Sequence, residues 1–280
     1  MSKLYLVYRE AVKILTAAGC EDPFFDAREL ADFSMGFNKT QLLLKGGEEL
    51  DPELEKKYMI CVQRRASREP LQYILGSWGF ERYRFLVGEG VLIPRPETEL
   101  LPAFAVEQLR KRPCAVIYDL CCGTGCVGIT VAKLFPTVRV FCIDLSDDAL
   151  AYANKNKEKL DAPNVTVLKA DVLEGGPLAG VPLPEMILSN PPYVPTSEIA
   201  DLQPEVRREP KMALDGGEDG LTFYRALAEK WFPLLPTDGT LAMECGEGQA
   251  EPILRLFISA SGGRLLKDAS GTDRVVVVRR

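Results

Sequence analysis

The four residues Asn190–Tyr193 (NPPY) put a side-chain amide directly before two prolines, at the end of an apolar run. Proline has no backbone N–H to give to a sheet, so a strand that reaches Asn190 must end there. The Asn190 side-chain oxygen and the Pro191 carbonyl oxygen can then each accept one N–H of a planar –NH2 group. Pro191 and Pro192 keep the turn stiff, and Tyr193 offers an aromatic face to a flat substrate.

A planar –NH2 group is a weak nucleophile because its lone pair is delocalised into the neighbouring π-system. Two acceptors hold such a nitrogen so that its lone pair can develop toward an electrophile, and they stabilise the positive charge that arrives. No proton has to be removed beforehand, which suits a chain without histidine. The segment therefore predicts group transfer to a carboxamide or to the exocyclic amine of adenine.

A glycine-rich segment, residues 119–128 (DLCCGTGCVG), lies upstream of this turn. Gly123 and Gly125 permit positive φ and a close approach of the backbone to a ligand, at a helix N-terminus with free N–H groups. Asp144 follows about 19 residues later, where a carboxylate can accept hydrogen bonds from two ribose hydroxyls. Together these residues predict a nucleoside cofactor.

Two kinds of nucleoside cofactor satisfy this pattern. Gly123, Gly125 and Gly128 have the G-x-G-x-x-G spacing of dinucleotide-binding loops, so an NAD-dependent dehydrogenase that uses Tyr or Lys as its acid/base stays open. Asp119, four residues before Gly123, and the position of the loop behind a helical segment favour S-adenosylmethionine instead.

Composition excludes several other classes of protein. The 280 residues are 46% hydrophobic and 26% charged, as in ordinary globular proteins. No apolar run could span a membrane and the N-terminus does not resemble a signal peptide, so we expect a cytoplasmic protein without a membrane partner. Cys121 and Cys122 are adjacent and most of the other six cysteines fall in apolar runs, which predicts reduced thiols. Without a CxxC pair or a histidine, the sequence predicts no metal site. The net charge of −6 argues against a nucleic-acid partner, and the one basic cluster complements the C-terminus of an expected helix: Arg64, Arg65 and Arg68.

The elements that must position these residues fall into three segments. Residues 1–76 have apolar positions at three- and four-residue spacing and predict a helical domain, in which Asp51 caps a helix that begins at Pro52. Residues 77–100 predict a linking β-hairpin with strands at 81–87 and 90–94. Residues 101–280 alternate strands and helices from about Ala115 onward, and Ser146 is expected as an N-cap.

The alternating segment predicts an α/β fold. Strands are expected at 114–121, 138–146, 164–172, 184–190 and 239–246, helices at 123–135, 147–160, 220–235 and 250–260, and two closing strands within 264–278. This order implies a mostly parallel, doubly wound sheet with helices on both faces and an antiparallel C-terminal strand pair. Because ligands bind at the carboxyl ends of such strands, Asn190 is expected to point toward the cofactor.

The line YDLCCGTGCVGI, residues 118–129, resembles the first motif of the class I (Rossmann-like) methyltransferases, with Cys121 where many members have glycine. The resemblance implies S-adenosylmethionine as cofactor and S-adenosylhomocysteine as product. It also implies two sets of cofactor residues. The loop and its neighbours are Asp119, Cys121, Cys122, Gly123, Thr124, Gly125 and Asp144, and the residues expected to face adenine are Asp171 and Val172.

Further segments make the resemblance more specific. Residues 68–76 (REPLQYILG), 93–101 (IPRPETELL), 190–227 and 271–278 (GTDRVVVV) together resemble the HemK/PrmC family, which methylates the glutamine of the Gly-Gly-Gln motif in class 1 peptide chain release factors. The resemblance implies that the helical domain helps to recognise the release factor. It further implies that Asn190, Pro191, Pro192 and Tyr193 bind the glutamine amide. Four more residues are expected near the pocket: Phe80, Arg95, Glu97 and Thr98.

Three alternatives remain besides the dehydrogenase. The acceptor can be another protein glutamine, for instance on a ribosomal protein, or the exocyclic amine of adenine in DNA or RNA. The chain can also be a binding module without activity if the cofactor loop no longer functions. Label transferred from S-adenosylmethionine to a release factor or to DNA separates these possibilities.

Overall fold

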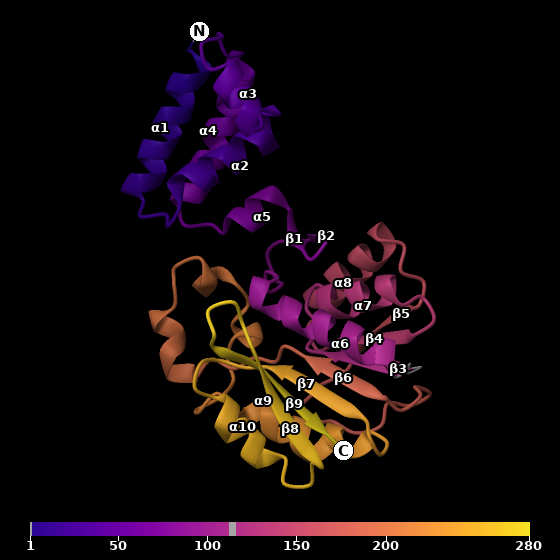
Figure 1. Ribbon diagram of the computed structural model, residues 1–280. Coiled ribbons are helices and arrows are strands. Elements are labelled where there is room, and N and C mark those ends of the chain that lie inside the picture. The colour runs from indigo at the N-terminus through magenta and orange to yellow at the C-terminus, as the bar shows by residue number, and fades with distance from the viewer. Residues whose placement is uncertain (1, 112–115) are drawn as a thin grey trace. The chain divides into compact units, whose positions relative to one another are not determined.

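The computed structural model describes residues 2–111 and 116–280, and the chain divides into two compact units (Figure 1). One unit is Met1–Ser77 with Gln203–Arg208, and the other is Trp78–Leu202 with Glu209–Arg280. The segment Gln203–Arg208 returns to the helical unit from a point far along the chain, which the sequence did not suggest. The predicted division into segments 1–76, 77–100 and 101–280 stays a prediction.

The first unit is helical, as expected for its sequence. Its helices are α1 (Leu4–Ala17), α2 (Pro23–Met35), α3 (Lys39–Leu44), α4 (Pro52–Ala66) and α5 (Leu71–Leu75). Asp51 caps α4 by accepting a hydrogen bond from the Glu53 N–H, with Pro52 in the first turn, so the predicted cap is confirmed. Leu15, Leu30 and Tyr58 are fully buried in the core of this unit.

The basic cluster at the end of α4 does more than complement a helix terminus. Arg65, only 5% exposed, binds the Asp26 carboxylate at 2.7 Å and the Glu205 carboxylate at 2.7 Å. Arg68 binds Glu205 through a second pair of atoms at 2.6 Å, and Arg64 pairs with Glu69. These ion pairs attach Gln203–Arg208 to the helices of the first unit.

The second unit contains a seven-stranded sheet in the order β5 (Val165–Lys169), β4 (Arg139–Asp144), β3 (Val116–Leu120), β6 (Met186–Ser189), β7 (Thr240–Glu244), β9 (Asp273–Arg279) and β8 (Gly262–Lys267). The first five strands are parallel, whereas β9 runs antiparallel to both β7 and β8. The predicted fold class, with its antiparallel C-terminal pair, is confirmed.

Helices cover both faces of this sheet (Figure 1). Residues of α6 (Leu100–Lys111), α7 (Cys126–Leu134) and α8 (Asp147–Lys159) share a buried cluster with Ile117 and Val140. Residues of α9 (Thr222–Ala226) and α10 (Ala250–Leu256) share the opposite cluster with Tyr118 and Phe141. Successive residues of one strand point to opposite faces, so a strand covered on both sides must be apolar throughout. This explains the continuous apolar runs in the sequence.

Several local expectations were wrong in detail. The hairpin is present, but it is made of β1 (Ser77–Phe80) and β2 (Tyr83–Leu86), and residues 91–94 form no strand. The helix expected at 220–235 is interrupted: α9 passes into a π-helical turn, η5 (Leu227–Trp231), and a 3-10 turn, η6 (Phe232–Leu234). The strand expected from residue 114 is described from Val116, because Cys114 and Ala115 lie outside the described residues.

The other 3-10 turns are short. The turns η1 (Pro96–Glu99), η2 (Thr196–Asp201) and η4 (Lys211–Ala213) belong to the second unit, and η3 (Val206–Arg208) belongs to the first. The seven cysteines in the described residues are free thiols. Within residues 2–111 and 116–280, none of the helices combines the length and the apolar character needed to cross a membrane.

The strand order creates a crevice in the second unit. From β3 the chain proceeds outward to β4 and β5, then returns to β6 on the other side of β3 and continues to β7. Such a reversal between adjacent parallel strands leaves a crevice at their carboxyl ends, where ligands bind in open α/β sheets. The glycine loop follows β3 and the NPPY turn follows β6, so the topology brings the two motifs to one place.

Candidate active site

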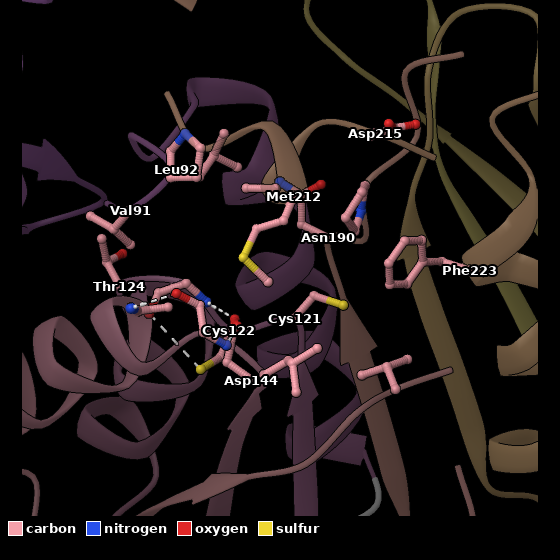
Figure 2. Close-up of a pocket in the computed structure, with 18 of the residues that line it drawn as sticks. Val91, Leu92, Cys121, Cys122, Thr124, Asp144, Asn190, Met212, Asp215 and Phe223 are labelled. Carbon is pink, nitrogen blue, oxygen red and sulfur yellow. Dashed lines mark hydrogen bonds between the residues drawn. The ribbon is translucent and has the colours of Figure 1, made fainter. Parts of the chain in front are cut away.

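A cavity of about 460 Å³ lies at these carboxyl ends, within the range of small-molecule and cofactor sites. Figure 2 shows Cys121, Cys122 and Asp144 below it, Val91 and Leu92 on one side and Phe223 on the other. Ten of the sequence-predicted site residues line it: Asp119, Cys121, Cys122, Gly123, Thr124, Asp144, Asp171, Val172, Asn190 and Pro192. Gly125, Pro191 and Tyr193 are not part of its lining.

The glycine loop has the backbone conformation that its sequence predicts. Gly123 and Gly125 have φ values of 54° and 75°. A Cβ added to Gly123 would meet only Val91 within 4 Å, at 3.9 Å, so the loop backbone is open to a ligand there. The Cβ position of Gly125 instead meets Ile129 at 2.8 Å, because this glycine faces its own helix rather than the cavity. Its role is therefore to let the loop turn.

Cys121 also adopts the left-handed region, with φ of 57°. A side chain in this conformation costs roughly 1–2 kcal/mol, which explains why glycine suits the position. The Cys121 side chain lines the cavity beneath Phe223 (Figure 2). Burial and the neighbouring carboxylates of Asp144 and Asp119 raise the pKa of its thiol, so it stays protonated.

Gly128 explains how α7 packs so closely on the sheet. An added Cβ would lie 2.7 Å from Cys142 Sγ and 3.0 Å from both Asp119 Oδ2 and Val140. The Gly128 N–H donates to Asp119 Oδ2 at 2.8 Å. Asp119 is thus buried between helix and strand, and burial raises its pKa to about 7. Asp119 supports the loop from below while it contributes to the cavity wall.

Asp144 connects the loop to the next strand. Its Oδ2 accepts the Gly123 N–H at 2.9 Å and its Oδ1 accepts the Ser146 N–H at 3.0 Å. Burial raises the pKa of this carboxyl group, although the backbone N–H groups of Gly123, Ser146 and Leu145 lower it. Each carboxylate oxygen has a second lone pair, so Asp144 can fix the loop and still accept hydroxyl groups from a ligand.

Asp171 and Val172 lie where the sequence predicts, after β5 on the cavity wall. Asp171 Oδ1 accepts the Leu173 N–H at 2.8 Å, so this residue also stabilises a turn. Val172 is held from behind, since its carbonyl accepts the Trp231 indole N–H at 2.8 Å.

Within the described residues, the Asn190 side chain has one hydrogen-bond partner. Its Nδ2 donates to Thr98 Oγ1 at 3.1 Å. Among residues 2–111 and 116–280, neither the Asn190 Oδ1 nor the Pro191 carbonyl accepts a hydrogen bond. The end of the strand is fixed one residue earlier, where Ser189 donates its hydroxyl to the Leu120 carbonyl at 2.9 Å. Both oxygens of the predicted acceptor pair are therefore available to a ligand.

The aromatic ring on the cavity wall belongs to a residue that the sequence did not suggest. The Tyr193 backbone carbonyl accepts a hydrogen bond from Gln249 Nε2 at 2.9 Å, and its ring packs close to Gly246. Phe223 instead lines the cavity, on the same side as Asp215 (Figure 2). A phenylalanine within an amphipathic helical pattern gives no sign of this role, because such residues are usually part of the core.

Two more residues of the site escaped sequence reasoning. Glu209, 5% exposed, accepts the Ile93 N–H at 2.8 Å and binds the Arg95 guanidinium, which fixes residues 91–95 along the cavity. Asn156, fully buried on α8, accepts the Leu86 N–H at 2.6 Å and donates to the Thr124 carbonyl at 3.0 Å. No spacing in the sequence marks either residue, since each acts on a segment far along the chain.

Of the four residues expected near the pocket, two line the cavity and two do not. Arg95 and Thr98 line the cavity. Phe80 belongs to the core, where it packs edge-on against Phe85 with ring centres 6.0 Å apart, and Glu97 is not part of the lining.

The residues present fit a nucleoside cofactor. The open backbone at Gly123 and the paired acceptors of Asp144 suit a ribose, and Asp171 keeps one carboxylate oxygen that can accept from an exocyclic amine. Asn190 lines the same cavity.

Comparison with known proteins identifies both units. Residues 7–76 match the family described as PrmC N-terminal domain, and residues 99–216 match the family described as methyltransferase small domain. The release factor glutamine methyltransferase of Thermodesulfovibrio yellowstonii is 37% identical, over 91% of this chain and 92% of that protein. The protein of that name in Geobacter sulfurreducens is 39% identical, over 94% of this chain and 91% of its own length.

Solved structures share the fold of the second unit at low sequence identity. The hMettl16 catalytic domain, in complex with an RNA hairpin, is 12% identical with a TM-score of 0.55, over 81% of this chain and 82% of that one. The 16S rRNA methyltransferase RsmC of T. thermophilus, in complex with AdoMet and guanosine, is 17% identical with a TM-score of 0.51, over 73% of this chain and 49% of that one.

Proposed function

Because the chain belongs to the release factor glutamine methyltransferase family, we propose that it methylates the side-chain amide nitrogen (N5) of the glutamine in the Gly-Gly-Gln motif of class 1 peptide chain release factors. It is an S-adenosylmethionine-dependent enzyme. When bound, S-adenosylmethionine supplies an electrophilic methyl group. The chain itself must hold the cofactor and make a sluggish amide nitrogen reactive.

We assign the cofactor to the loop Cys121–Gly125 and to the acids around it. Asp144 would accept the ribose hydroxyls, Asp171 and Val172 would border the adenine, and the open backbone at Gly123 would allow the cofactor a close approach. Asp119 acts from beneath, through its hydrogen bond to Gly128.

We assign the glutamine amide to Asn190 and the prolines that follow it. Asn190 Oδ1 and the Pro191 carbonyl accept the two amide N–H groups, and Pro192 stiffens the turn that carries them. The two oxygens orient the nitrogen lone pair toward the methyl group and stabilise the positive charge that develops on nitrogen. Phe223 and Tyr193 are the candidates for contact with the flat amide, and of the two only Phe223 lines the cavity.

One observation carries this proposal: Asn190 borders the cavity with its NH2 end bound to Thr98 and its oxygen free. An asparagine that only stabilised a turn would use its oxygen on a nearby backbone N–H.

We further propose that the helical unit helps to recognise the release factor. The net charge of −6 supports a protein substrate over a nucleic acid, whose phosphates usually demand a basic face. A substrate that acts in translation implies a cytoplasmic location.

The proposal is tested by incubating the enzyme with labelled S-adenosylmethionine and one of three acceptors. These are a class 1 release factor, the same factor with the glutamine of its Gly-Gly-Gln motif changed to alanine, and DNA. We expect label only in the unmodified factor. Label in DNA, or equal label in the altered factor, would contradict the proposal.

Replacing Asn190 with alanine removes one of the two amide acceptors. We expect Asn190→Ala to lower kcat by at least about 100-fold, because the nitrogen is no longer oriented, while cofactor affinity changes by only a few fold. Asn154→Ala is the matched control, since Asn154 is an exposed asparagine on α8 outside the cavity lining. Turnover that matches this control would remove Asn190 from the mechanism.

A further inference from the structure

The acceptor turn, residues 190–193, must hold its two oxygens at fixed positions, because both of them orient the substrate nitrogen. One of these oxygens is the Pro191 carbonyl, which belongs to the backbone. Its direction therefore depends on the peptide groups that follow it. Among the backbone angles between the Pro191 carbonyl and the Tyr193 carbonyl, the ring of Pro192 fixes one. A group that holds the Tyr193 carbonyl thus also constrains the Pro191 carbonyl.

The peptide group between Tyr193 and Val194 is held at both of its polar atoms. The Tyr193 carbonyl accepts a hydrogen bond from Gln249 Nε2 at 2.9 Å, and the Val194 N–H donates to the Leu214 carbonyl at 2.9 Å. A peptide group is planar and rotates as one body, so it cannot turn without losing one of these two bonds. The acceptor turn is therefore anchored directly after its last residue.

Gln249 lies directly before α10, and its side chain joins two backbone segments. Its Oε1 accepts the Gly246 N–H at 2.9 Å, while its Nε2 donates to the Tyr193 carbonyl. An N–H can only donate and a carbonyl can only accept, so these two partners select one orientation of the Gln249 amide. The side chain that precedes a helix often caps its free N–H groups, but that of Gln249 forms no such bond. Both ends of this amide are used on the two loops instead.

Gly220 leaves the room in which this hydrogen bond forms. A Cβ added to Gly220 would lie 2.5 Å from Gln249 Nε2 and closer still to the Tyr193 carbonyl oxygen. Any other residue would therefore push the donor and the acceptor apart. Gly216 makes a second close contact with the turn, because its Cβ position lies 2.8 Å from Tyr193 Cα and 2.9 Å from the Pro192 carbonyl oxygen. Both glycines thus let their segment pack directly on the backbone of the acceptor turn.

We propose that Gln249 is a positioning residue for methyl transfer and that Gly220 provides the space in which it acts, an inference that rests on the proposed function. Neither residue is part of the cavity lining. Gln249 holds the Tyr193 carbonyl, and through the stiff turn it sets the direction in which the Pro191 carbonyl meets the substrate N–H. Loss of this contact should slow the transfer step and leave cofactor binding unchanged.

Replacing Gln249 with glutamate tests the proposal at almost unchanged side-chain volume. At pH 8 one carboxylate oxygen can still accept the Gly246 N–H, but the other one places an acceptor against the Tyr193 carbonyl. We expect Gln249→Glu to lower kcat with the release factor by about 10- to 100-fold, because the Pro191 carbonyl is displaced. The KM for the release factor and the affinity for S-adenosylhomocysteine should both stay within a few fold of wild type.

Gln108→Glu is the matched control, since it makes the same change of atoms on α6, outside the cavity lining. We expect this variant to keep the kcat and the cofactor affinity of wild type. In every variant kcat is taken per active site, counted by titration with S-adenosylhomocysteine, so that unfolded protein does not imitate a slower reaction. If Gln249 has a merely structural role, Gln249→Glu will lower the number of active sites and not kcat, and this result would overturn the proposal.

Replacing Gly220 with alanine tests the same hydrogen bond from its other side. The added methyl group separates Gln249 from the Tyr193 carbonyl, and we expect kcat to fall as it does in Gln249→Glu. Gly220 has a φ of 72°, where a side chain is strained, so the control is Gly180→Ala, with a φ of 74° and no atom within 4 Å of the added Cβ. Because both changes break one hydrogen bond, the double variant should be no slower than the slower single variant, and effects that multiply would contradict the shared contact.

NMR on the free enzyme makes the test independent of activity. Tyr193–Val194 is the only Tyr-Val pair in the sequence, so isotope labels on the tyrosine carbonyl carbon and the valine nitrogen give one cross-peak for this peptide group. We expect its carbonyl signal to shift in Gln249→Glu and in Gly220→Ala and to stay in place in Gly180→Ala. A signal that does not move in the first two variants would refute the positioning scheme. Failure of the proposed function is recognised separately, because the wild-type enzyme would then leave the release factor unlabelled.

Discussion

Replacing Asp144 with asparagine tests whether one carboxylate both holds the glycine loop and binds the ribose. In the native protein Oδ2 accepts the Gly123 N–H at 2.9 Å and Oδ1 accepts the Ser146 N–H at 3.0 Å. Asparagine keeps the shape but turns one of these acceptors into an NH2 group. That group must face a backbone N–H, so either the loop or the turn after β4 loses its partner.

The expected loss follows from the hydrogen bonds removed. A hydrogen bond to a charged acceptor contributes about 1.5–3 kcal/mol, and tenfold in affinity corresponds to about 1.4 kcal/mol. Asp144→Asn should therefore weaken S-adenosylhomocysteine binding by about 10- to 150-fold. The measurement is isothermal titration calorimetry at pH 8.

The matched control is Asp147→Asn, the same change of atoms three positions away. Asp147 is 82% exposed at its side chain and pairs with Lys169 on the surface. Exposed ion pairs contribute about 0–1 kcal/mol, and this one does not border the cavity, so cofactor affinity should stay within about twofold. Equal affinities in the two variants would refute the assignment of Asp144.

A ligand without the ribose 2′-hydroxyl distinguishes the two tasks of Asp144. If the Asp144 carboxylate binds this hydroxyl, a ligand without the hydroxyl should lose more affinity for the wild-type protein than for the Asp144→Asn variant. The effects of two groups that contact each other are not additive. If the loss is the same in both proteins, Asp144 only supports the loop and the ribose is bound elsewhere.

Two further predictions concern stability, each measured by urea unfolding with hydrogen exchange to resolve the two units. Gly128→Ala puts a Cβ 2.7 Å from Cys142 Sγ, so the free energy of unfolding of the second unit should fall by about 1–2 kcal/mol although alanine has the better helix propensity. Gly79→Ala is the control, because its added Cβ has no atom within 4 Å, and it should lower the free energy of unfolding by less. Glu205→Gln should cost the first unit about 2–3 kcal/mol at pH 7. Burial raises the pKa of Glu205, but the hydrogen bonds from Arg68 and Arg65 outweigh it and lower this pKa from 4.5 to about 2. This difference should shrink as pH falls from 4.5 toward 2, and a constant difference would contradict the ion-pair explanation.

Periodicity and turn chemistry predicted most of the helices and strands of the two units. The apolar strands, the alternation with helices and the caps at Asp51 and Ser146 are local features, and the structure confirms them. The hairpin strands were wrong because β2 ends at Leu86 and residues 91–94, although apolar and β-branched, are held by Glu209 along the cavity instead of by a neighbouring strand. A short apolar run does not reveal which partner satisfies its backbone.

The cofactor side of the site was more predictable than the acceptor side. Gly123, Asp144 and Asp171 lie at or just after the ends of β3, β4 and β5, and the parallel order of those strands brings them to one cavity. Phe223 and Glu209 come from the long segment after β6, whose path depends on packing rather than on any repeat. Tyr193 was expected to offer its ring to the flat acceptor group, and it is not part of the cavity lining.

By itself the sequence determined which groups could do chemistry: an amide before two prolines, a glycine turn with acids at the ends of strands, and no histidine. These follow from the covalent limits of proline and glycine and from the period of buried strands, all of which act locally. Only the tertiary structure decided what binds the Asn190 side chain. Its Nδ2 donates to Thr98 Oγ1 across 92 residues of chain, and a contact between segments so far apart leaves no trace in local sequence.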